Sequence, residues 1–543
     1  MARYLRNLIN RNKTQREPLP GQSRNSAGGY VWAVDDWVKL DRFLILGSEK
    51  GSYYATERQL TQESVSAVHV CVKQDGRRVV RRIVEISRAG RAPKNDPALL
   101  ALAIAATAGD LETRRAAFDA LPQVARTGTH LFHFVAYLDA LRGWGRLARR
   151  GVARWYTAQD PANLALQLIK YRQRDGWTHR DVLRLCHARA QGVTGDLLYW
   201  AVRGWPGVGQ EPHPDAVLRR VWALERVQRA TTVEEVARLI EEYKLPRETV
   251  PTEWLREART WAALLPHMPM EAMLRNLATM TRIGLIASGS DATRFVEARL
   301  ADRALVRRAR LHPVKILAAL LTYRAGHGRR GRHVWRPVGS IIDALDSAFY
   351  SAFDAVEPTG RRLVLALDVS ESMSCGRIGG VPGLTPRVAS AACALVTAAT
   401  EPQWRIMAFS HKLVPVHISP DMRLETVLQL SDLPMGATDC ALPMLWAIKK
   451  GVRADAFIIY TDSETWYGDV HPAEALQRYR DKFGIPAKLI VVGMVSNGFS
   501  IADPNDPGMF DVVGFDTATP ALISDMIADR GAVPIEEIED IIG

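Results

Sequence analysis

The 543-residue sequence contains few cysteines and no long apolar run. Its five cysteines are widely spaced and include no CxxC pair, the spacing that zinc and redox motifs favour. No stretch reaches about eighteen uninterrupted apolar residues, and the N-terminal MARYLRNLINRNKTQ lacks the apolar core of a secretion signal. We therefore expect reduced structural thiols, no association with membranes and a cytoplasmic location.

Lysine is scarce throughout, and acidic residues are scarce in the first two-thirds of the chain. Only 13 of the 71 basic residues are lysines. From Val356 onward, 15 basic residues face 24 acidic ones, a balance of −9, whereas the first 355 residues hold 56 and 35, a balance of +21. A basic surface attracts polyanions through phosphate contacts and counterion release. Nucleic acid is therefore the partner expected for the N-terminal part.

Alternating strand-like patterns are rare between residues 95 and 350. Stretches such as DPALLALAIAATAGD, TVEEVARLIEEYKL and MEAMLRNLATMTRIGL repeat apolar residues every three or four positions, which is typical of amphipathic helices. Such helices in succession, without a strict sequence repeat, predict an irregular stack of helical hairpins. An exposed strand pair is expected instead at Arg77, Arg78, Arg81 and Arg82.

The pattern changes at Glu357-Pro358-Thr359-Gly360. Beyond this point the apolar runs RLVLAL, WRIMAF, AFIIYT and AKLIVVG alternate with helical stretches. Continuous apolar strands separated by helices predict a parallel sheet that is covered on both faces. We therefore predict a helical domain over residues 1–357 and a doubly wound α/β domain over residues 358–543.

Oxygen-bearing side chains follow several of the predicted strands. Asp368 ends the first strand and precedes Ser370 and Ser372, Thr438 lies in the turn-like segment GATD, and Asp462 follows AFIIYT. Ligands of an open parallel sheet gather at the carboxyl ends of its strands. This all-oxygen set fits Mg²⁺ or another divalent cation that retains several waters. The alternative is that the serines cap a helix start, and a two-metal nuclease would require more carboxylates.

The segment 163–187 contains two predicted helices joined by a turn at Asp175-Gly176. On the first helix, Gln167, Lys170 and Arg174 are expected to share the face opposite the apolar one. On the second helix, Arg180, Arg184 and His187 fall at positions i, i+4 and i+7 and are expected on the side opposite the apolar one. The expected RNA-binding residues of the two helices are Lys170, Arg174, Arg180, Arg184 and His187. Basic residues hold phosphates, and a histidine can also stack on a base or hydrogen-bond to it. The alternative is that the basic faces of both helices are ordinary solvated helix faces.

Two further groups of residues contain basic side chains or histidines. The run from Arg324 to Arg336 is a second basic loop, for which RNA contact and packing on the C-terminal domain both remain open. His130 and His133 are expected to be core or edge histidines rather than metal ligands.

Several stretches resemble one known family. DVSESMS at 368–374, with GATD and YTDSE, resembles the metal-ion-dependent adhesion site of a von Willebrand factor A domain. Four stretches resemble the TROVE module of the Ro autoantigen family. They are DRFLILGSEKGSYYATER at 41–58, GTHLFHFVAYL at 128–138, IKYRQRDGWTHRDVLRLCH at 169–187 and TYRAGHGRRGRHVWRP at 322–337. Residues 471–509 resemble the Ro version of the A domain.

This resemblance implies an all-α HEAT-like helical-repeat ring followed by an α/β doubly wound von Willebrand factor A domain. It also implies a non-enzymatic protein that binds Y RNA and single-stranded 3′ ends of other noncoding RNA in RNA quality control, with an exoribonuclease such as polynucleotide phosphorylase as a partner. Lys170, Arg174 and His187 match positions that bind Y RNA in the family. The alternative function is a metal-dependent RNA hydrolase, although no catalytic base or nucleophile supports it. The sequence departs from the family pattern at Glu371 and Ala437, and neither change removes a ligand atom.

Overall fold

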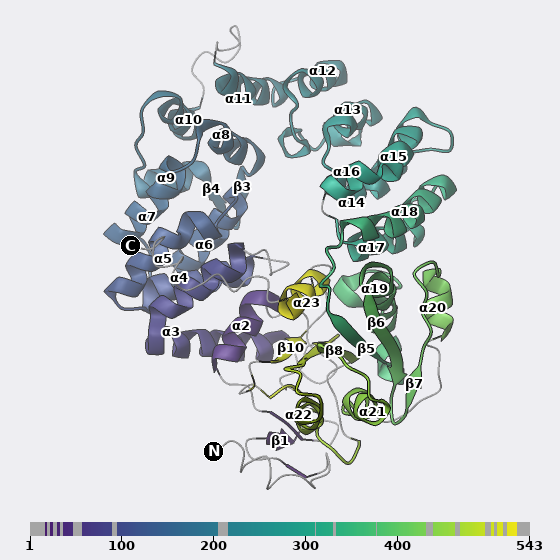
Figure 1. Cartoon of the computed structure of the whole chain (residues 1–543). Helices are drawn as coiled ribbons and strands as arrows, with labels where there is room; N and C mark the ends of the chain where they lie inside the picture. Colours follow the sequence, from purple (N-terminus) through teal and green to yellow (C-terminus); the bar gives the residue numbers. More distant parts are fainter. Residues whose placement is uncertain are drawn as a thin grey trace. The chain divides into compact units, whose positions relative to one another are not determined.

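The computed structural model describes residues 17–18, 22–24, 30–32, 36–46, 57–88, 95–204, 215–309, 311–328, 333–375, 377–430, 438–461, 467–494, 501–503, 506, 508–513 and 519–528 (Figure 1). These residues divide into two compact units. The helical unit comprises residues 65–300 and 333–344, and the α/β unit comprises residues 301–332 and 345–528 with parts of the first 64 residues. No helix within the described ranges is long and apolar enough to cross a membrane.

The helical unit consists of successive short helices and one two-stranded hairpin. In chain order its elements are α3 (Glu57–Arg88, from Val65 onward), α4 (Asp96–Ala108), α5 (Leu111–Val124), α6 (Gly128–Leu141), α7 (Arg146–Thr157), α8 (Pro161–Lys170), β3 (Gln173–Arg174), β4 (Trp177–Thr178), α9 (His179–Cys186), α10 (Gly192–Arg203), α11 (Ala216–Val227), α12 (Val233–Tyr243), η1 (Arg247–Thr249), η2 (Trp254–Arg256), α13 (Ala258–Leu264), η3 (Leu265–His267), α14 (Met270–Arg282) and α15 (Asp291–Ala301). The helical pattern of the sequence is therefore confirmed.

Local sequence signals explain where many of these helices begin. Asp110 caps α5 by accepting a hydrogen bond from Thr113 N, and this backbone hydrogen bond is the main reason that the pKa of Asp110 is lowered. Thr127 caps α6 in the same way, and Asp160 caps α8, with Pro161 at its first position. The caps satisfy amide groups that the first helical turn leaves without partners.

The strand pair expected around Arg77 to Arg82 is wrong, because these residues lie in α3. Their apolar neighbours Val79, Val80 and Ile83 are buried on one helix face. The helix is kinked at Asp75 (φ −156°, ψ 84°), whose Oδ1 accepts a hydrogen bond from Arg78 N at 2.9 Å. Val79, Val80 and Ile83 are β-branched, and β-branched residues favour strands by propensity. Their spacing also places them on one face of a helix, and burial of that face outweighs the propensity.

The α/β unit contains a six-stranded sheet, and the continuous apolar runs predicted four of its strands. Its strands are β5 (Arg362–Asp368), β6 (Gln403–Phe409), β7 (Leu413–Pro415), β8 (Ala456–Thr461), β9 (Lys488–Gly493) and β10 (Met509–Val513). The order is β10-β9-β8-β5-β6-β7, and all neighbours are parallel except β7, which runs antiparallel to β6. The sheet is therefore mixed, and β5, which carries Asp368, lies in its interior.

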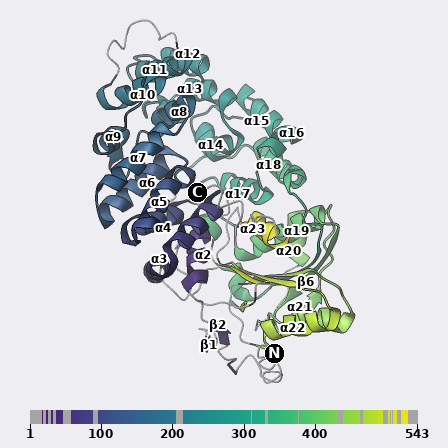
Figure 2. The same cartoon turned by 60° about the vertical axis from the view of Figure 1, so that its left-hand side comes forward.

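Helices cover both faces of this sheet (Figure 2). The helices of the unit are α2 (Asp36–Leu46), α16 (Arg303–Arg308), α17 (Pro313–Arg324), α18 (Gly339–Ser351, from Leu345 onward), η4 (Ala352–Ala355), η5 (Glu371–Ser374), η6 (Ile378–Gly380), α19 (Pro386–Thr400), α20 (Leu424–Leu430), α21 (Leu442–Lys450), α22 (Pro472–Phe483) and α23 (Thr519–Ala528). The N-terminal strands β1 (Gln22–Arg24) and β2 (Tyr30–Trp32) pair antiparallel. Side chains of α21 and α22 share one core cluster with β5 and β8, and α19 packs against β5 and β6.

Two short helices before the predicted domain boundary pack within the α/β unit. α16 contacts η4, and α17 contacts α19. The predicted boundary between residues 357 and 358 lies where the sequence composition changes. The compact units follow the contacts in the structure, so residues 301–332 and 345–357 belong to the unit that contains the sheet.

Candidate functional site

The basic segment begins on α8. Leu164, Leu168 and Ile169 are buried, so the helix is fixed by its apolar face, as predicted. Lys170 is the last residue of the helix and is half-buried, with its Nζ 5.3 Å from the centroid of the Tyr171 ring. The helix therefore delivers one lysine to its C-terminal end, where a cation is also favoured by the helix dipole.

Gln167 does not share the exposed face that the helical wheel gave it. Its side chain is buried, and its Oε1 accepts a hydrogen bond from Gly128 N at 2.9 Å. A side chain at Gly128 would also place its Cβ 2.8 Å from Tyr171 Cβ. Gln167 therefore joins α8 to the start of α6, and the exposed stripe expected on α8 is interrupted at this position.

Arg174 lies beyond the helix, in the two-residue strand β3. Asp175 and Gly176 both have positive φ angles, 51° and 80°, which is the geometry of a type I′ hairpin turn. Arg174 pairs with Trp177 across the hairpin, its side chain is 60% exposed, and its Nε lies 3.7 Å from Asp175 Oδ1. The hairpin rather than a helix face therefore presents this arginine.

The turn of the hairpin is held by His133 of α6. Its Nδ1 lies 2.5 Å from Asp175 Oδ2, and its Nε2 lies 3.3 Å from Asp96 Oδ1 at the start of α4. The imidazole, with only 14% of its side chain exposed, joins two carboxylates from separate elements. His133 was expected at a core or an edge, but its partners are 37 and 42 residues away, so no local spacing could reveal them.

α9 presents the second group of basic residues. Thr178 and Asp181 form a capping box at its start, with Asp181 N donating to Thr178 Oγ1 and Thr178 N donating to Asp181 Oδ2. Arg180 and Arg184 are exposed, four residues apart on the helix. His187 is also exposed, but it stands one residue past the helix in the left-handed region (φ 54°, ψ 38°). The helical spacing expected for His187 therefore applies only to the two arginines.

The buried His179, the first residue of α9, fixes this helix on its inner side. His179 Nδ1 lies 2.9 Å from Tyr156 Oη of α7, and its ring contacts Phe132 and Trp155. Burial lowers the pKa of His179 to about 4. His179 is therefore neutral at pH 7 and fixes α9, while the charges lie on the outer side.

The structure describes only part of the second basic loop. Arg324, His327, His333 and Arg336 are exposed, whereas Arg329, Arg330 and Arg332 lie outside the described residues. His130 also lies in the helical unit. Its Nδ1 lies 3.5 Å from Asn95 Nδ2, and burial lowers the pKa of His130 to about 4.

The predicted metal site begins at the carboxyl end of β5. The Asp368 carboxylate is 1% exposed, and its Oδ1 accepts a hydrogen bond from Ser370 N at 2.8 Å. Its Oδ2 accepts one from Thr461 Oγ1 at 2.7 Å, at the end of β8. The hydroxyls of Ser370 and Ser372 lie 3.1 Å apart. Three of the five predicted ligands are thus brought together, and Thr461 is a supporting residue that the sequence did not reveal.

Thr438 belongs to the same edge of the sheet. It is buried, and its carbonyl accepts a hydrogen bond from Tyr467 N. The next residue, Asp439, donates its N–H to Ser410 O just beyond β6, the strand beside β5. Asp462 follows Thr461 directly but lies outside the described residues, as does Ala437.

The donor chemistry of this edge fits a hard cation. Carboxylate and hydroxyl oxygens are the ligands that Mg²⁺ accepts, and two fixed hydrogen bonds already orient the Asp368 carboxylate. Mg²⁺ would be held by Asp368, Ser370, Ser372, Thr438 and Asp462. Within the described ranges, no group of three or more His, Cys, Asp or Glu side chains is placed to hold a metal ion, so a site built mainly from carboxylates or imidazoles is not seen there.

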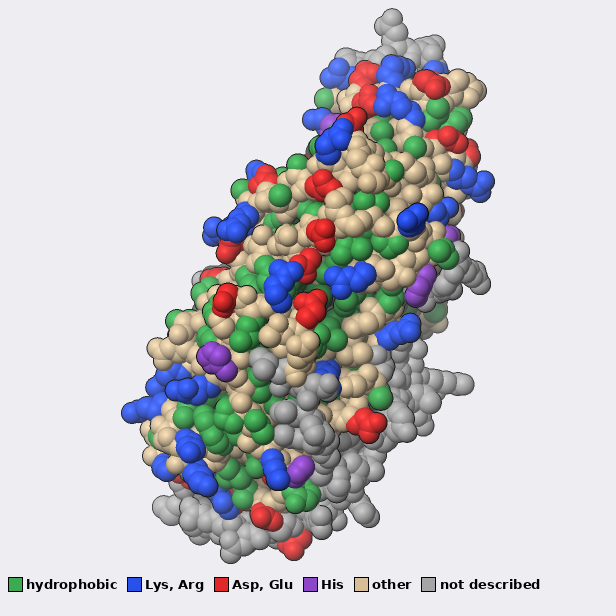
Figure 3. All heavy atoms as spheres, turned by 90° about the vertical axis from the view of Figure 1, so that its right-hand side faces the viewer, with side chains coloured by type: hydrophobic (Ala, Val, Ile, Leu, Met, Phe, Trp, Pro, Cys, Tyr) green, Lys and Arg blue, Asp and Glu red, His purple; other side chains and the backbone are tan. Residues whose placement is uncertain are grey.

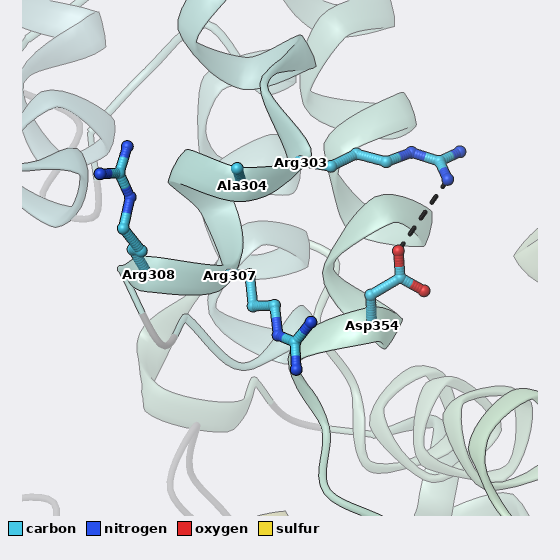
Figure 4. Close-up of a pocket in the computed structure, with 5 residues that line it drawn as sticks. All are labelled: Arg303, Ala304, Arg307, Arg308 and Asp354. Carbon is cyan, nitrogen blue, oxygen red and sulfur yellow. Dashed lines mark ion pairs between the residues drawn. The ribbon is translucent and has the colours of Figure 1, made fainter.

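A shallow pocket in the α/β unit is lined by Arg303, Ala304, Arg307 and Arg308 of α16 and Asp354 of η4 (Figure 4). Arg303 Nη1 lies 3.9 Å from Asp354 Oδ2. The guanidinium groups of the three arginines point in different directions, so they do not converge on one ligand. This pocket contains none of the predicted site residues.

Comparison with known proteins gives the same domain composition as the geometry. The sequence model of the TROVE domain matches residues 23–203 and 240–322, and that of the Ro60 vWA domain matches residues 362–527. The chain is 44% identical over 529 residues to RNA-binding protein RO60 of Deinococcus radiodurans, which covers 96% of this chain and 99% of that protein. It is 34% identical over 588 residues to RNA-binding protein RO60 of Caenorhabditis elegans, with 94% and 90% covered.

A solved structure is similar across the same length. The crystal structure of the Deinococcus radiodurans RO (RSR) protein has a TM-score of 0.78 and 42% sequence identity, and it covers 91% of this chain and all of that one. The resemblance expected from the sequence motifs is confirmed, together with a helical-repeat N-terminal region and a C-terminal von Willebrand factor A domain. The chain therefore belongs to the Ro60 family, in which a TROVE domain is joined to a Ro60 vWA domain.

Proposed function

We propose that this chain binds Y RNA and other noncoding RNA through the surface formed by α8, the β3–β4 hairpin and α9. The observation that carries the proposal is the group of basic side chains that this short segment presents: Lys170, Arg174, Arg180, Arg184 and His187. The relatives in Deinococcus radiodurans and Caenorhabditis elegans are named RNA-binding proteins, which supports the same ligand class here.

We assign the phosphate contacts and the base contacts to different residues of this surface. Arg174, Arg180 and Arg184 are exposed guanidinium groups, whose planar fork suits phosphate oxygens. His187 stands beyond the end of α9, where its exposed ring is available for stacking on an unpaired base or hydrogen bonding to it. The proposal therefore assigns positioning to the arginines and part of the base recognition to His187.

The proposed role is non-enzymatic RNA quality control in the cytoplasm, in which the protein presents RNA to an exoribonuclease such as polynucleotide phosphorylase. Mg²⁺ at the Asp368 edge would retain Lewis acidity for a carboxylate of a partner protein, because few charges surround it. Residues 356–543 have an acidic balance of −9, which makes the part of the chain that carries Asp368 a poor surface for phosphates. The metal site is therefore proposed to serve architecture or partner binding.

A cleavage assay separates this function from a metal-dependent RNA hydrolase. Pure protein is incubated with end-labelled structured RNA and Mg²⁺, and both bound RNA and cleaved RNA are measured. The proposal expects stable binding without turnover. Cleavage that is lost in Asp368→Ala would support the hydrolase instead. Sequencing the RNA that copurifies with the protein would identify the bound RNAs.

The proposal also includes recognition of unpaired 3′ ends. A structured RNA with a single-stranded 3′ extension should bind more tightly than the same RNA with a blunt end, because unpaired bases offer stacking surfaces in addition to phosphates. Equal affinity in a competition assay would remove this part of the proposal.

A further inference from the structure

One helix of the helical unit presents four arginines on its outer face. Arg146, Arg149, Arg150 and Arg154 of α7 are all exposed. Their spacing of three, four and eight residues from Arg146 places them on one side of a helix. The residues on the opposite side are buried, namely Ala148, Gly151, Val152, Trp155 and Tyr156.

Packing fixes which face of α7 is outward. A side chain at Gly151 would place its Cβ 2.6 Å from Phe118 Cβ, so α7 lies closely on α5. Trp155 Nε1 donates to Ala125 O at 2.5 Å, and Tyr156 Oη lies 2.9 Å from His179 Nδ1. These contacts prevent rotation of α7 about its axis, so the arginine face is held outward.

Most of this arginine charge is not neutralised by the protein. Arg154 forms an ion pair with Asp119, with Nη1 and Oδ1 2.8 Å apart. Arg146, Arg149 and Arg150 form no ion pair with any residue that the structure describes. Like charges three or four residues apart destabilise a helix. A surface that maintains three such charges in one helical turn is suited to a ligand that supplies many negative charges.

Some other exposed arginines of the same unit have acidic partners. Arg238 pairs with Glu242, Arg259 with Glu241 and Arg275 with Glu271. On the face drawn in Figure 3, basic and acidic side chains are likewise interspersed. α7 differs from these paired positions because Arg146, Arg149 and Arg150 lie close together on one helix without acidic partners among the described residues.

α7 lies beside the proposed RNA surface. Figures 1 and 2 show α7 and α9 next to each other, and the two helices are in contact. α9 contributes the exposed Arg180 and Arg184. Two neighbouring helices thus carry exposed arginines, and the Tyr156–His179 contact joins them from inside.

We infer that Arg146, Arg149 and Arg150 of α7 form a further RNA-binding site, which holds backbone phosphates of the RNA bound at α8, β3 and α9. The inference rests on the proposed function. Arginine forks suit phosphate oxygens, and contacts to phosphates carry no sequence information. A membrane surface would require exposed apolar side chains on the same helix, whereas Trp155 and Tyr156 of α7 are buried. The site therefore adds affinity without sequence preference.

The test compares two variants of equal charge change in the full-length protein. Arg146→Gln with Arg149→Gln and Arg150→Gln removes the inferred site, and Arg238→Gln with Arg259→Gln and Arg275→Gln is the matched control from paired arginines. A fluorescein-labelled RNA hairpin with a single-stranded 3′ extension is titrated between about 50 and 200 mM salt. The magnitude of the slope of log K against log salt should fall by about 2.1 to 2.7 in the α7 variant, at about 0.7 to 0.9 for each of three lost phosphate contacts.

At the lowest salt, affinity should fall by about tenfold in the α7 variant and by about twofold at most in the control. Arg→Lys at the same three positions should restore most of the slope, because the charge is retained. Equal slopes in the α7 and control variants would overturn the inference.

Two further outcomes distinguish this inference from the proposed function. If Lys170→Ala with Arg174→Ala weakens binding while the α7 variant does not, the α7 site is wrong and the proposed function stands. If wild-type protein binds the hairpin without salt dependence, both are wrong. Thermal unfolding of the α7 variant and of its control should match wild type, since the six substituted arginines are exposed.

Discussion

The proposed RNA surface and the predicted metal site at the end of β5 differ in where their charged groups lie. Around α8, β3 and α9 the charged groups are largely exposed, while buried neutral residues such as Gln167 and His179 hold the frame. At the end of β5 the charged group itself is buried, and Asp368 is fixed by Ser370 N and Thr461 Oγ1. An exposed cation contributes to RNA affinity through counterion release. A buried carboxylate contributes to metal binding because its hydrogen bonds fix its orientation.

This difference determines which substitutions affect which property. Removing an exposed cation should leave stability nearly unchanged and alter the salt dependence of RNA binding. Removing the buried carboxylate should alter stability and metal response, because its two donors lose their acceptor. The following predictions test this separation.

The largest effect is expected at the RNA surface. Lys170→Ala with Arg174→Ala should weaken Y RNA binding by about tenfold or more, since hydrogen bonds to charged groups contribute about 1.5 to 3 kcal/mol each. The salt slope should fall by about 1.4 to 1.8 for two lost phosphate contacts. His187→Ser is the comparison variant, and it should weaken binding with little change in slope. Unchanged affinity in a filter-binding titration of both variants would place the RNA site elsewhere.

The next effect concerns the predicted metal site. Asp368→Ala leaves Ser370 N and Thr461 Oγ1 without their acceptor, so unfolding free energy should fall by about 1 to 3 kcal/mol. Mg²⁺ should raise the thermal midpoint of wild type, because it binds the native state, and should not raise that of the variant. Y RNA affinity should stay within about threefold, or about 0.7 kcal/mol.

Asp368→Asn is the matched control for this prediction. The amide keeps an acceptor oxygen and nearly the same shape, so it should recover part of the stability and none of the metal response. A midpoint that still rises with Mg²⁺ in both variants would contradict the metal assignment. A collapse of RNA binding in a folded variant would show that the two regions are not separable.

The sequence could predict those site residues whose positions follow from the local pattern of a single strand or helix. Asp368 could be predicted because a continuous apolar run places it at the end of a strand, and the α9 arginines because they stand four residues apart in a segment with a helical pattern. Gln167 was assigned to the wrong face, because its acceptor role for Gly128 depends on a residue 39 positions away. β7 and β10 were not predicted, since three and five residues at sheet edges carry little periodicity.

The third prediction concerns the buried frame under α9. The pKa of His179 is lowered by burial to about 4, against an ordinary value of 6.5. Between these values the unfolded chain binds more protons than the folded one. The stability from neutral His179 is therefore complete above about pH 6.5 and declines toward pH 4, by up to about 1.4 kcal/mol per pH unit.

His179→Gln removes this titration and keeps an acceptor for Tyr156. Thermal midpoints of wild type and variant should be measured from pH 7 to pH 5, and the advantage of wild type should shrink as pH falls. His130 and His312, whose pKa values burial also lowers to about 4, are present in both proteins and cancel in the difference. A constant difference across this range would show that His179 does not titrate as described.

The smallest effect is expected from His133, which touches the RNA surface only through another residue. His133→Ala removes the contact to Asp175 and frees the hairpin turn, so RNA affinity should fall by about two- to fivefold, the size of one ordinary hydrogen bond of about 0.5 to 1 kcal/mol. The salt slope should not change, because no phosphate contact is removed. His130→Gln is the matched control, since no contact between His130 and the hairpin is found among the described residues. A fall in slope equal to that of Arg174→Ala would mean that His133 contacts RNA directly, and unchanged affinity would mean that the turn keeps its geometry through Asp175 and Gly176 alone.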